Sequence, residues 1–244
     1  MKDKVLHYSE YTTSLFEYDF SIASHALIDA CNASIISNLV KNLDFNKKEL
    51  VILDAGCGTG QVTRMLNGIK GVTAEACDID PEAKKYFQSN PETKNIKYYN
   101  LDFINDELPR FYDAIITRGV YHHVPKEQRP KLLANVMKFT SLFINADEGI
   151  LEYSSESERL SNCNVWYSFV INEAKRRHLY ALATMESDYL RHEKLNTADD
   201  GGDLKESPEQ FINDCNAAHL SKPEIQLLGD WEKYKGGFYT AILK

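Results

Sequence analysis

The chain has 244 residues, 43% of them hydrophobic and 26% charged, and a formal net charge of −8 at pH 7. This composition is ordinary for a globular protein and allows a substantial core. The acidic balance argues against a surface that binds nucleic acid through its phosphates, because such surfaces are usually strongly basic.

Residues 1–49 are predicted to form an amphipathic helical cap, because apolar residues recur there at helical spacing. A segment that precedes the first strand of a nucleotide-binding sheet often covers the ligand. Tyr8 and Tyr11 are therefore candidate acceptor contacts. For each tyrosine alone, packing in the core or on the surface is the alternative.

The stretch from Leu50 to Leu53 is an apolar run that predicts a strand buried on both faces. An acid, Asp54, follows it, and a helical pattern begins at Gln61. Between them, three glycines alternate with small residues: Gly56, Gly58 and Gly60. Such glycines allow a tight turn and let a ligand lie against the backbone beside the free N–H groups of a helix start. The stretch predicts a nucleotide-type binding turn.

The residues of this turn narrow the choice of ligand. Gln61 breaks the dinucleotide fingerprint G-x-G-x-x-G counted from Gly56, and the sequence has no Walker loop. The carboxylate of Asp54 would repel a pyrophosphate but suits an ammonium group. A glycine-rich turn without any ligand is the alternative.

The pattern D-x-G-x-G-x-G from Asp54 to Gly60 resembles motif I of the class I S-adenosylmethionine (SAM)-dependent methyltransferases. Their cofactor ends in an amino acid and carries no phosphate, which fits a carboxylate at the turn. The resemblance covers about residues 48–150 and implies SAM as the cofactor.

Strands and helices alternate along the segment that follows. Further strands are expected at Val72–Cys77, Ile96–Asn100, Phe111–Thr117 and Ser141–Asp147. Helices are expected to start near Pro81 and to span Lys126–Phe139. This alternation predicts βαβ units and a parallel sheet with right-handed crossovers.

Acidic residues end the second and third strands, at the edge where open α/β sheets bind ligands. Asp78 is positioned for both hydroxyls of a ribose, and Asp80 is the near alternative, although it is also a good helix N-cap. Asp102 is positioned to accept a hydrogen bond from an adenine amino group, with Ile79 or Phe103 packing on the ring. The complete predicted cofactor set is Asp54, Gly56, Cys57, Gly58, Gly60, Asp78, Ile79, Asp102, Phe103 and Arg118.

The segment Arg118-Gly119-Val120-Tyr121-His122-His123-Val124-Pro125 ends the fourth strand and resembles the motif IV region of small-molecule methyltransferases. The Asn-Pro-Pro-Tyr type of sequence found in base- and glutamine-modifying enzymes is absent. His122 or His123 could act as a general base near neutral pH, and packing is the alternative for each. Glu148, after the fifth strand, is the third candidate catalytic residue.

Residues 154–215 interrupt the alternation and are interpreted as a helical insertion before the sixth strand. One long helix is expected from Val165 to about Leu195, with Trp166 and Tyr167 as candidate acceptor contacts. A further helix restarts at Ser207-Pro208, which form a good cap.

The chain is predicted to close with an antiparallel pair, Pro223–Leu228 and Phe238–Leu243, joined through Gly236-Gly237. The expected fold is α/β: a Rossmann-like, doubly wound, seven-stranded sheet, mostly parallel with an antiparallel final strand. We expect a single domain made of a cap (1–49), a SAM-binding core (50–153), the insertion (154–215) and closing strands (216–244).

The cysteines and the first residues bear on the compartment. Five cysteines are scattered without a C-x-x-C pair, which favours free thiols in a reducing compartment. The first residues form no apolar signal core, and no run approaches the length of a membrane span. We expect a cytoplasmic monomer or homodimer with no membrane partner and, since metal-ligand spacings are absent, no metal.

The predicted function is direct in-line methyl transfer from SAM to a small-molecule acceptor, with no nucleic-acid partner. Such transfer needs alignment and exclusion of water more than covalent help. Arg118 and the histidines would suit an anionic acceptor. Two alternatives remain open: a SAM-binding protein that catalyses a non-methyl reaction, and a non-catalytic binding module on the same fold.

Overall fold

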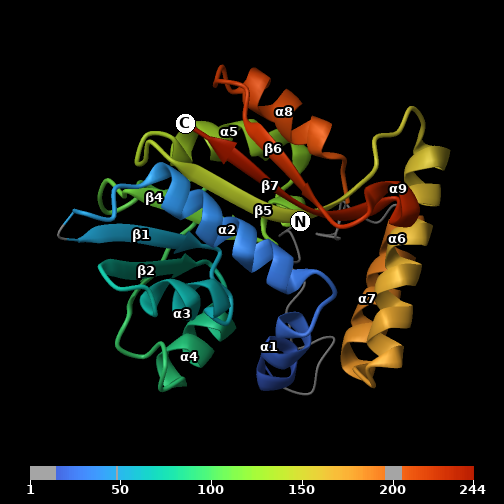
Figure 1. Cartoon of the computed structure of the whole chain (residues 1–244), viewed down its shortest axis with the longest axis horizontal. Coiled ribbons are helices and arrows are strands. Elements are labelled where there is room, and N and C mark those ends of the chain that lie inside the picture. Colours follow the sequence, from blue (N-terminus) through green and yellow to red (C-terminus); the bar gives the residue numbers. More distant parts are fainter. Residues whose placement is uncertain (1–14, 48, 196–204) are drawn as a thin grey trace.

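The computed structural model describes residues 15–47, 49–195 and 205–244, and a seven-stranded sheet forms its centre (Figure 1). The strands are β1 Leu50–Ala55, β2 Val72–Asp78, β3 Lys97–Asn100, β4 Ala114–Arg118, β5 Phe143–Ile150, β6 Glu224–Leu228 and β7 Gly236–Leu243. Their order across the sheet is β3-β2-β1-β4-β5-β7-β6. β1 to β5 pair in parallel, and β7 runs antiparallel to both β5 and β6. The predicted fold class is confirmed.

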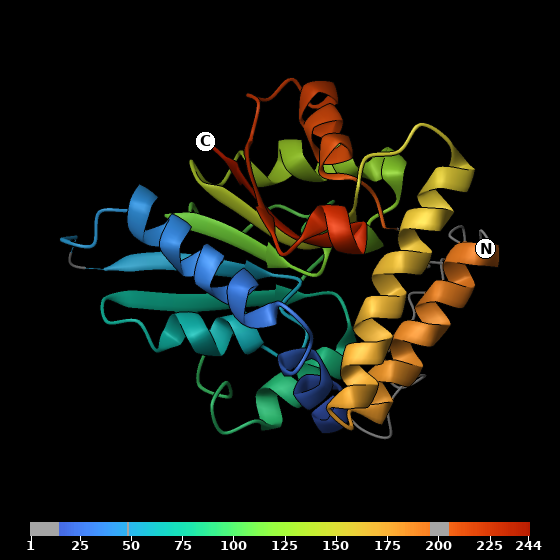
Figure 2. The same ribbon diagram turned by 45° about the vertical axis from the view of Figure 1, so that its right-hand side comes forward.

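Helices cover both faces of this sheet (Figures 1 and 2). They are α1 Leu15–Ala23, α2 Ile28–Asn42, α3 Gln61–Asn67, α4 Pro81–Ser89, α5 Arg129–Val136, α6 Glu156–Arg176, α7 Tyr180–Leu195, α8 Pro208–Ala217 and α9 Trp231–Tyr234. Two 3₁₀ turns, η2 Tyr121–His123 and η3 Lys126–Gln128, follow β4. None of the described helices is long and apolar enough to cross a membrane.

The strand β1 is buried on both faces, as its apolar run predicts. Val51 and Leu53 belong to the core cluster that includes residues of α5 and α8. Leu50 and Ile52 belong to the other cluster, with residues of α2 and α3. The alternation of strand side chains therefore places β1 at the centre of two hydrophobic layers.

The insertion corrects the prediction of one long helix over Val165–Leu195. It forms a hairpin of two helices, α6 and α7, which pack along each other and, through Trp166 and Tyr167, on Ile150 of β5. Figures 1 and 2 show this pair and α1 facing the carboxyl ends of the parallel strands.

A Schellman cap ends α6 and explains the break. His178 adopts a left-handed conformation with φ 61° and donates its N–H to the Lys175 carbonyl at 3.0 Å. The Leu179 N–H donates to the Ala174 carbonyl at 2.9 Å. Glycine usually occupies this position. Because histidine does so here, the sequence carried no signal for the turn.

The connection between the closing strands also differs from the prediction. Residues 229–235, including α9, join β6 to β7, and Gly236 and Gly237 are the first residues of β7. A Cβ on Gly236 would lie 2.7 Å from the Gly149 carbonyl oxygen, and one on Gly237 would lie 2.5 Å from that of Leu228. These glycines therefore permit close packing between neighbouring strands and make no turn.

Several element ends differ from the predicted ones. β4 begins at Ala114, since Tyr112 forms only an isolated bridge with Thr140. β5 continues to Ile150, because its antiparallel pairing with β7 extends that far. The helix predicted over Lys126–Phe139 is divided into η3 and the shorter α5.

We expect His178→Gly to stabilise the protein by about 0.5 kcal/mol, because glycine adopts the left-handed conformation without the steric cost that a side chain has there. Urea unfolding followed by circular dichroism measures the change. The neighbouring Arg177→Gly is the control: Arg177 has φ −94°, so glycine there should destabilise by about 0.5–1 kcal/mol. Equal destabilisation by both variants would contradict the role of His178.

Candidate active site

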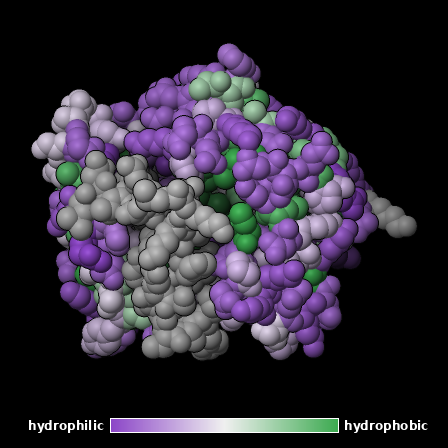
Figure 3. Space-filling view, turned by 180° about the vertical axis from the view of Figure 1, so that it is seen from behind, coloured by the Kyte–Doolittle hydropathy of each residue, from purple (hydrophilic) through white to green (hydrophobic). Residues whose placement is uncertain are grey.

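A cavity of about 420 Å³ lies at the carboxyl ends of the parallel strands. Its volume falls in the range of small-ligand sites, about 300–1,000 Å³. The glycine turn and the ends of β2 and β4 line one side, and α1 and α7 contribute Tyr18, Ile22, Glu186 and Tyr189. Seen from behind, the surface has apolar residues gathered in a hollow (Figure 3).

The glycine turn presents its backbone to this cavity. Gly56 and Gly58 both line it with positive φ angles of 72° and 50°. A Cβ on Gly56 would lie 2.7 Å from the side chain of Val120, so only glycine fits. Gly119 also lines the cavity, and a Cβ there would meet nothing within 4 Å. The backbone on this side therefore leaves room for a ligand.

Asp78, at the end of β2, lines the cavity and also holds the turn. Its carboxylate accepts hydrogen bonds from the N–H of Gly58 at 2.8 Å and of Asp80 at 2.9 Å. Burial raises the pKa of Asp78. Each oxygen retains a lone pair, so the carboxylate can still accept hydrogen bonds from a ligand. Asp80 lines the cavity too and caps α4, as predicted, by accepting the Glu82 N–H.

The structure places two predicted cofactor residues behind the cavity wall. Asp54 is 2% exposed and accepts a hydrogen bond from the Thr63 hydroxyl at 2.5 Å. Burial raises its pKa to about 6. Gly60 begins α3, and a Cβ there would lie 2.8 Å from the ring of Phe87. Both residues support the turn from outside the cavity lining.

The remaining predicted cofactor residues line the cavity: Cys57, Ile79, Asp102, Phe103 and Arg118. Burial raises the pKa of the Cys57 thiol well above its usual value, so this cysteine is kept as a neutral thiol. Asp102 accepts the Ile104 N–H at 2.9 Å. Arg118 donates to Asn32 at 2.8 Å and to Gln61 at 2.5 Å, which ties β4 to α2 and α3.

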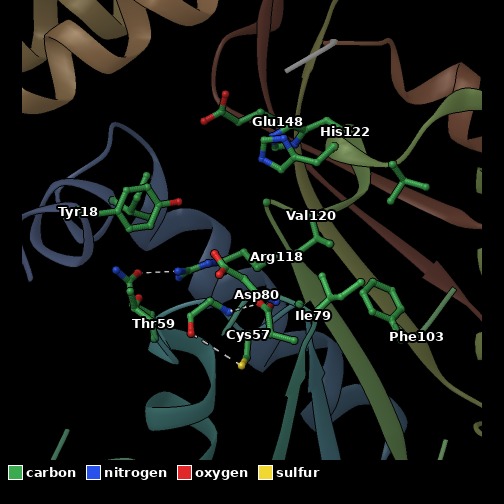
Figure 4. A pocket seen from close by; sticks show the side chains of 18 of the residues that line it. Tyr18, Cys57, Thr59, Ile79, Asp80, Phe103, Arg118, Val120, His122 and Glu148 are labelled. Atoms are coloured by element: carbon green, nitrogen blue, oxygen red, sulfur yellow. Dashed lines mark hydrogen bonds between the residues drawn. The ribbon is translucent and has the colours of Figure 1, made fainter. Parts of the chain in front are cut away.

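The helix α1 is fastened to the glycine turn through Asp19. The Asp19 carboxylate accepts from Arg64 at 2.9 Å and from the Thr59 hydroxyl, and its carbonyl accepts from Gln61 at 2.6 Å. These contacts set α1 at the cavity, with Tyr18 facing it (Figure 4). Tyr8 and Tyr11, the candidate acceptor contacts in the cap, lie outside the described residues.

The candidate base His122 is oriented by a buried acid. Its Nδ1 contacts Oδ1 of Asp147, and its backbone N–H donates to Oδ2 of the same residue at 3.1 Å. An ionised carboxylate can accept a hydrogen bond but cannot donate one, so Nδ1 of His122 carries the proton. Nε2 can then act as the base. The neighbouring His123 is exposed, and its ring packs against that of His122 at an interplanar angle of 51°, with ring centroids 4.0 Å apart.

Of the three other candidate residues, Glu148 lies at the cavity, and Trp166 and Tyr167 lie in the core. Glu148 lines the cavity, and Figure 4 shows it beside His122, across the pocket from Cys57 and Thr59. Trp166 and Tyr167 are fully buried and do not line the cavity. Trp166 donates to Glu148 at 3.4 Å, so it supports the wall from behind.

Sequence reasoning did not select five lining or supporting residues: Tyr18, His25, Asp147, Glu186 and Lys205. Asp147 had a usable signal, because it is the last residue of the predicted fifth strand and stands beside Glu148. The others come from α1, the α1–α2 turn, α7 and the segment before α8. Their positions depend on how the cap and the insertion fold back over the sheet.

The strand order places β7 antiparallel between β5 and β6, and the glycine turn lies beside acids at the carboxyl ends of β2 and β3. Together these features define the class I methyltransferase fold. Residues 52–141 match a family described as "Methyltransferase domain". This part of the chain is therefore a methyltransferase domain, and the recognition made from the sequence, that of a SAM-dependent methyltransferase domain, is confirmed.

Curated relatives resemble part of the chain. Human tRNA N(3)-cytidine methyltransferase METTL6 is 29% identical over 39% of this chain and 36% of its own length. Ribosomal RNA small subunit methyltransferase A of Mesomycoplasma hyopneumoniae is 30% identical over 45% of this chain and 41% of its own length. Malonyl-[acyl-carrier protein] O-methyltransferase of Acetivibrio thermocellus is 32% identical over 35% of this chain and 31% of its own length. The chain thus spans less than half of each relative.

Solved structures share the fold over nearly the whole chain. The DhpI-SAM-HEP complex has a TM-score of 0.59 and 16% identity, covering 97% of this chain and 94% of that one. Magnesium protoporphyrin IX methyltransferase (ChlM) from Synechocystis PCC 6803 with bound SAH has a TM-score of 0.56 and 13% identity, covering 96% of this chain and 95% of that one.

The relatives correct the prediction about partners. The exclusion of nucleic acid was wrong, because two of these relatives are named for tRNA and ribosomal RNA. Net charge sums over the whole surface, whereas binding of a nucleic acid depends on local charge around one site. A formal charge of −8 therefore does not exclude an RNA acceptor.

The raised pKa of Asp54 predicts a pH dependence of stability. An unfolded aspartate has a pKa of about 3.9, so the folded protein binds more protons than the unfolded one between that pH and about 6. The contribution of Asp54 to the unfolding free energy is fully present below its pKa in the unfolded protein. This contribution is lost as the pH rises through its pKa in the folded protein. Between about pH 4 and pH 7, the unfolding free energy should fall by on the order of 2 kcal/mol more in the wild type than in Asp54→Asn.

Urea unfolding at the two pH values measures this difference. The exposed Asp44→Asn is the control and should keep the wild-type pH dependence. Identical pH dependence in Asp54→Asn and the wild type would show that Asp54 is not protonated in this range.

Proposed function

We propose that the protein transfers the methyl group of SAM to an acceptor held in the cavity. One observation carries this proposal: in a methyltransferase domain, Gly56, Gly58 and Gly119 line the cavity together with Asp78, whose carboxylate accepts the Gly58 N–H. The arrangement fits a cofactor that lies against the backbone and presents ribose hydroxyls to an acid.

The cavity lining supports an assignment for the ribose and for the adenine of the cofactor. Asp78 would accept the ribose hydroxyls, with Asp80 as its neighbour in the lining. Asp102 would accept from the adenine amino group, between Ile79 and Phe103. Asp54 is assigned a supporting role, because it lies behind the wall, where it is hydrogen-bonded to Thr63.

SAM supplies an electrophilic methyl group when it is bound. The residues of the chain align the acceptor and keep water away. His122 holds a proton-accepting Nε2, oriented by the buried carboxylate of Asp147, so it is the proposed base for an acceptor that must lose a proton. Asp147 is a positioning residue in this proposal.

The size of the cavity supports an acceptor group that is small and enters between α1, α7 and the ends of β4 and β5. A free small molecule is one source of such a group, and a base or ribose presented by an RNA is the other source that the relatives raise. The two sources share the chemistry of an oxygen or nitrogen nucleophile next to His122.

We expect Asp78→Ala to weaken binding of SAM by at least about tenfold, since a charged acceptor of hydrogen bonds is lost. Isothermal titration calorimetry measures the affinity. Asp78→Asn, which keeps one acceptor oxygen for the turn, guards against loss of folding and should also weaken binding. The control is Asp113→Ala at the opposite, amino end of β4. Unchanged affinity in folded Asp78 variants would remove the ribose assignment.

Transfer itself is tested with methyl-labelled SAM and a cell extract, separated afterwards into small molecules, RNA and protein. We expect label in the small-molecule or the RNA fraction, which identifies the source of the acceptor. His122→Asn should lower the labelling by about 10²–10⁴-fold with SAM affinity unchanged.

The adjacent His123→Asn is the matched control and should retain labelling within about tenfold of the wild type. If SAM binds tightly and no fraction is labelled, the protein is a binding module and the proposed transfer is wrong. Equal loss in both histidine variants would remove the assignment of His122 as base.

A further inference from the structure

A second group of titratable side chains lies in the same cavity and has no role in the proposed transfer. It comprises His25, between α1 and α2, Glu148 of β5 and Glu186 of α7. All three are largely excluded from solvent, with side-chain exposures of 2%, 10% and 4%. Buried carboxylates normally require a cation or strong hydrogen bonds close by, and Glu148 has one such partner in Lys205, whose Nζ lies 2.8 Å from its Oε2.

The tautomer of His25 follows from its backbone contact. Its Nδ1 lies 2.7 Å from the carbonyl oxygen of Ala26, which can only accept, so Nδ1 carries a proton. The ring packs edge-on against Phe238, which fixes its direction. In the neutral ring, Nε2 therefore presents a lone pair.

This Nε2 atom is aimed between two carboxylates. It lies 3.1 Å from Oε1 of Glu148 and 3.6 Å from Oε1 of Glu186. Despite these short distances, it makes no hydrogen bond within residues 15–47, 49–195 and 205–244. In the neutral ring this lone pair is repelled by the two anionic oxygens, and either protonation of Nε2 or a cation between the three atoms removes the repulsion.

The distance from His25 to Glu148 falls in the range expected for two ligands of one metal ion, and the distance to Glu186 lies just above it. Metal–ligand bonds of about 2.0–2.2 Å at angles near 90–110° separate neighbouring donor atoms by roughly 3.0–3.5 Å. One donor atom from each of the three residues lies within 4.8 Å of the other two. A histidine whose other ring nitrogen donates to a backbone carbonyl is also the usual arrangement in metal sites.

From these observations we propose that His25, Glu148 and Glu186 form a site for a divalent metal ion. One imidazole and two carboxylates favour a first-row ion that accepts both nitrogen and oxygen, such as Mn²⁺, Fe²⁺ or Zn²⁺. Lys205 contacts Oε2 of Glu148 at 2.8 Å, which leaves Oε1 directed to His25. Since all three ligands line the cavity, a bound ion is accessible to an oxygen of the acceptor.

The sequence gives no indication of this site, because its ligands are separated by 123 and 38 positions (25 to 148 and 148 to 186). The expectation that the protein has no metal rested on the absence of short ligand spacings. The cluster forms only where α7 and the α1–α2 turn meet the end of β5.

Metal binding is tested without SAM, after removal of metal by a chelator. Mn²⁺ is titrated and followed by electron paramagnetic resonance, and Zn²⁺ by calorimetry. We expect one ion per chain for the wild type and a rise in its melting temperature on binding. Glu186→Gln, which preserves shape, should weaken affinity by more than about tenfold and abolish that rise.

The matched control is Asp188→Asn on the same helix, since this side chain is 38% exposed and lies outside the cluster. It should bind as the wild type does. His25→Ala is the second variant, and its circular dichroism shows whether loss of binding accompanies loss of fold. The proposal is overturned if the wild type binds neither ion, or if folded Glu186→Gln binds as tightly as Asp188→Asn. Either result leaves the labelling test of methyl transfer unaffected.

Discussion

The structure depends on how the end of β2 holds the glycine turn that follows β1. The Cys77 carbonyl accepts the N–H groups of Gly56 and Cys57 at 2.8 and 3.0 Å, and the Asp78 carboxylate accepts that of Gly58. These bonds satisfy backbone N–H groups of a turn in which three of the five residues are glycines without side chains. They also leave one face of the turn open to the cavity. Asp78, which is proposed to bind the cofactor, therefore also holds the turn that forms the binding site.

The sheet and this turn could be predicted from the sequence because their signals are local. The apolar run of β1, the alternating glycines and the Asp80 cap before Pro81 each determine their own conformation. The break between α6 and α7 could not be predicted, because His178 occupies a position where glycine is the usual signal. Helical periodicity continues across such a turn, so it predicts one helix where there are two.

The acceptor side could be predicted only in part, because its residues come together through tertiary packing. His122 and Glu148 were candidates from their place at strand ends, whereas Trp166 and Tyr167 proved to be core residues. The helices α1 and α7 bring the rest, and α1 is held by a contact between Asp19 and Arg64, which are 45 positions apart. The exclusion of a nucleic-acid partner from the net charge failed for a similar reason, because the net charge gives no information on where the charges lie.

The central claim is that the turn and the acids at the ends of β2 and β3 bind one cofactor. A crystal structure of the protein with S-adenosylhomocysteine tests it most directly. We predict the ribose hydroxyls at Asp78, the adenine between Ile79 and Phe103 with its amino group at Asp102, and the sulfur directed toward His122. A ligand bound elsewhere, or one whose ribose makes no contact with Asp78, would contradict the account.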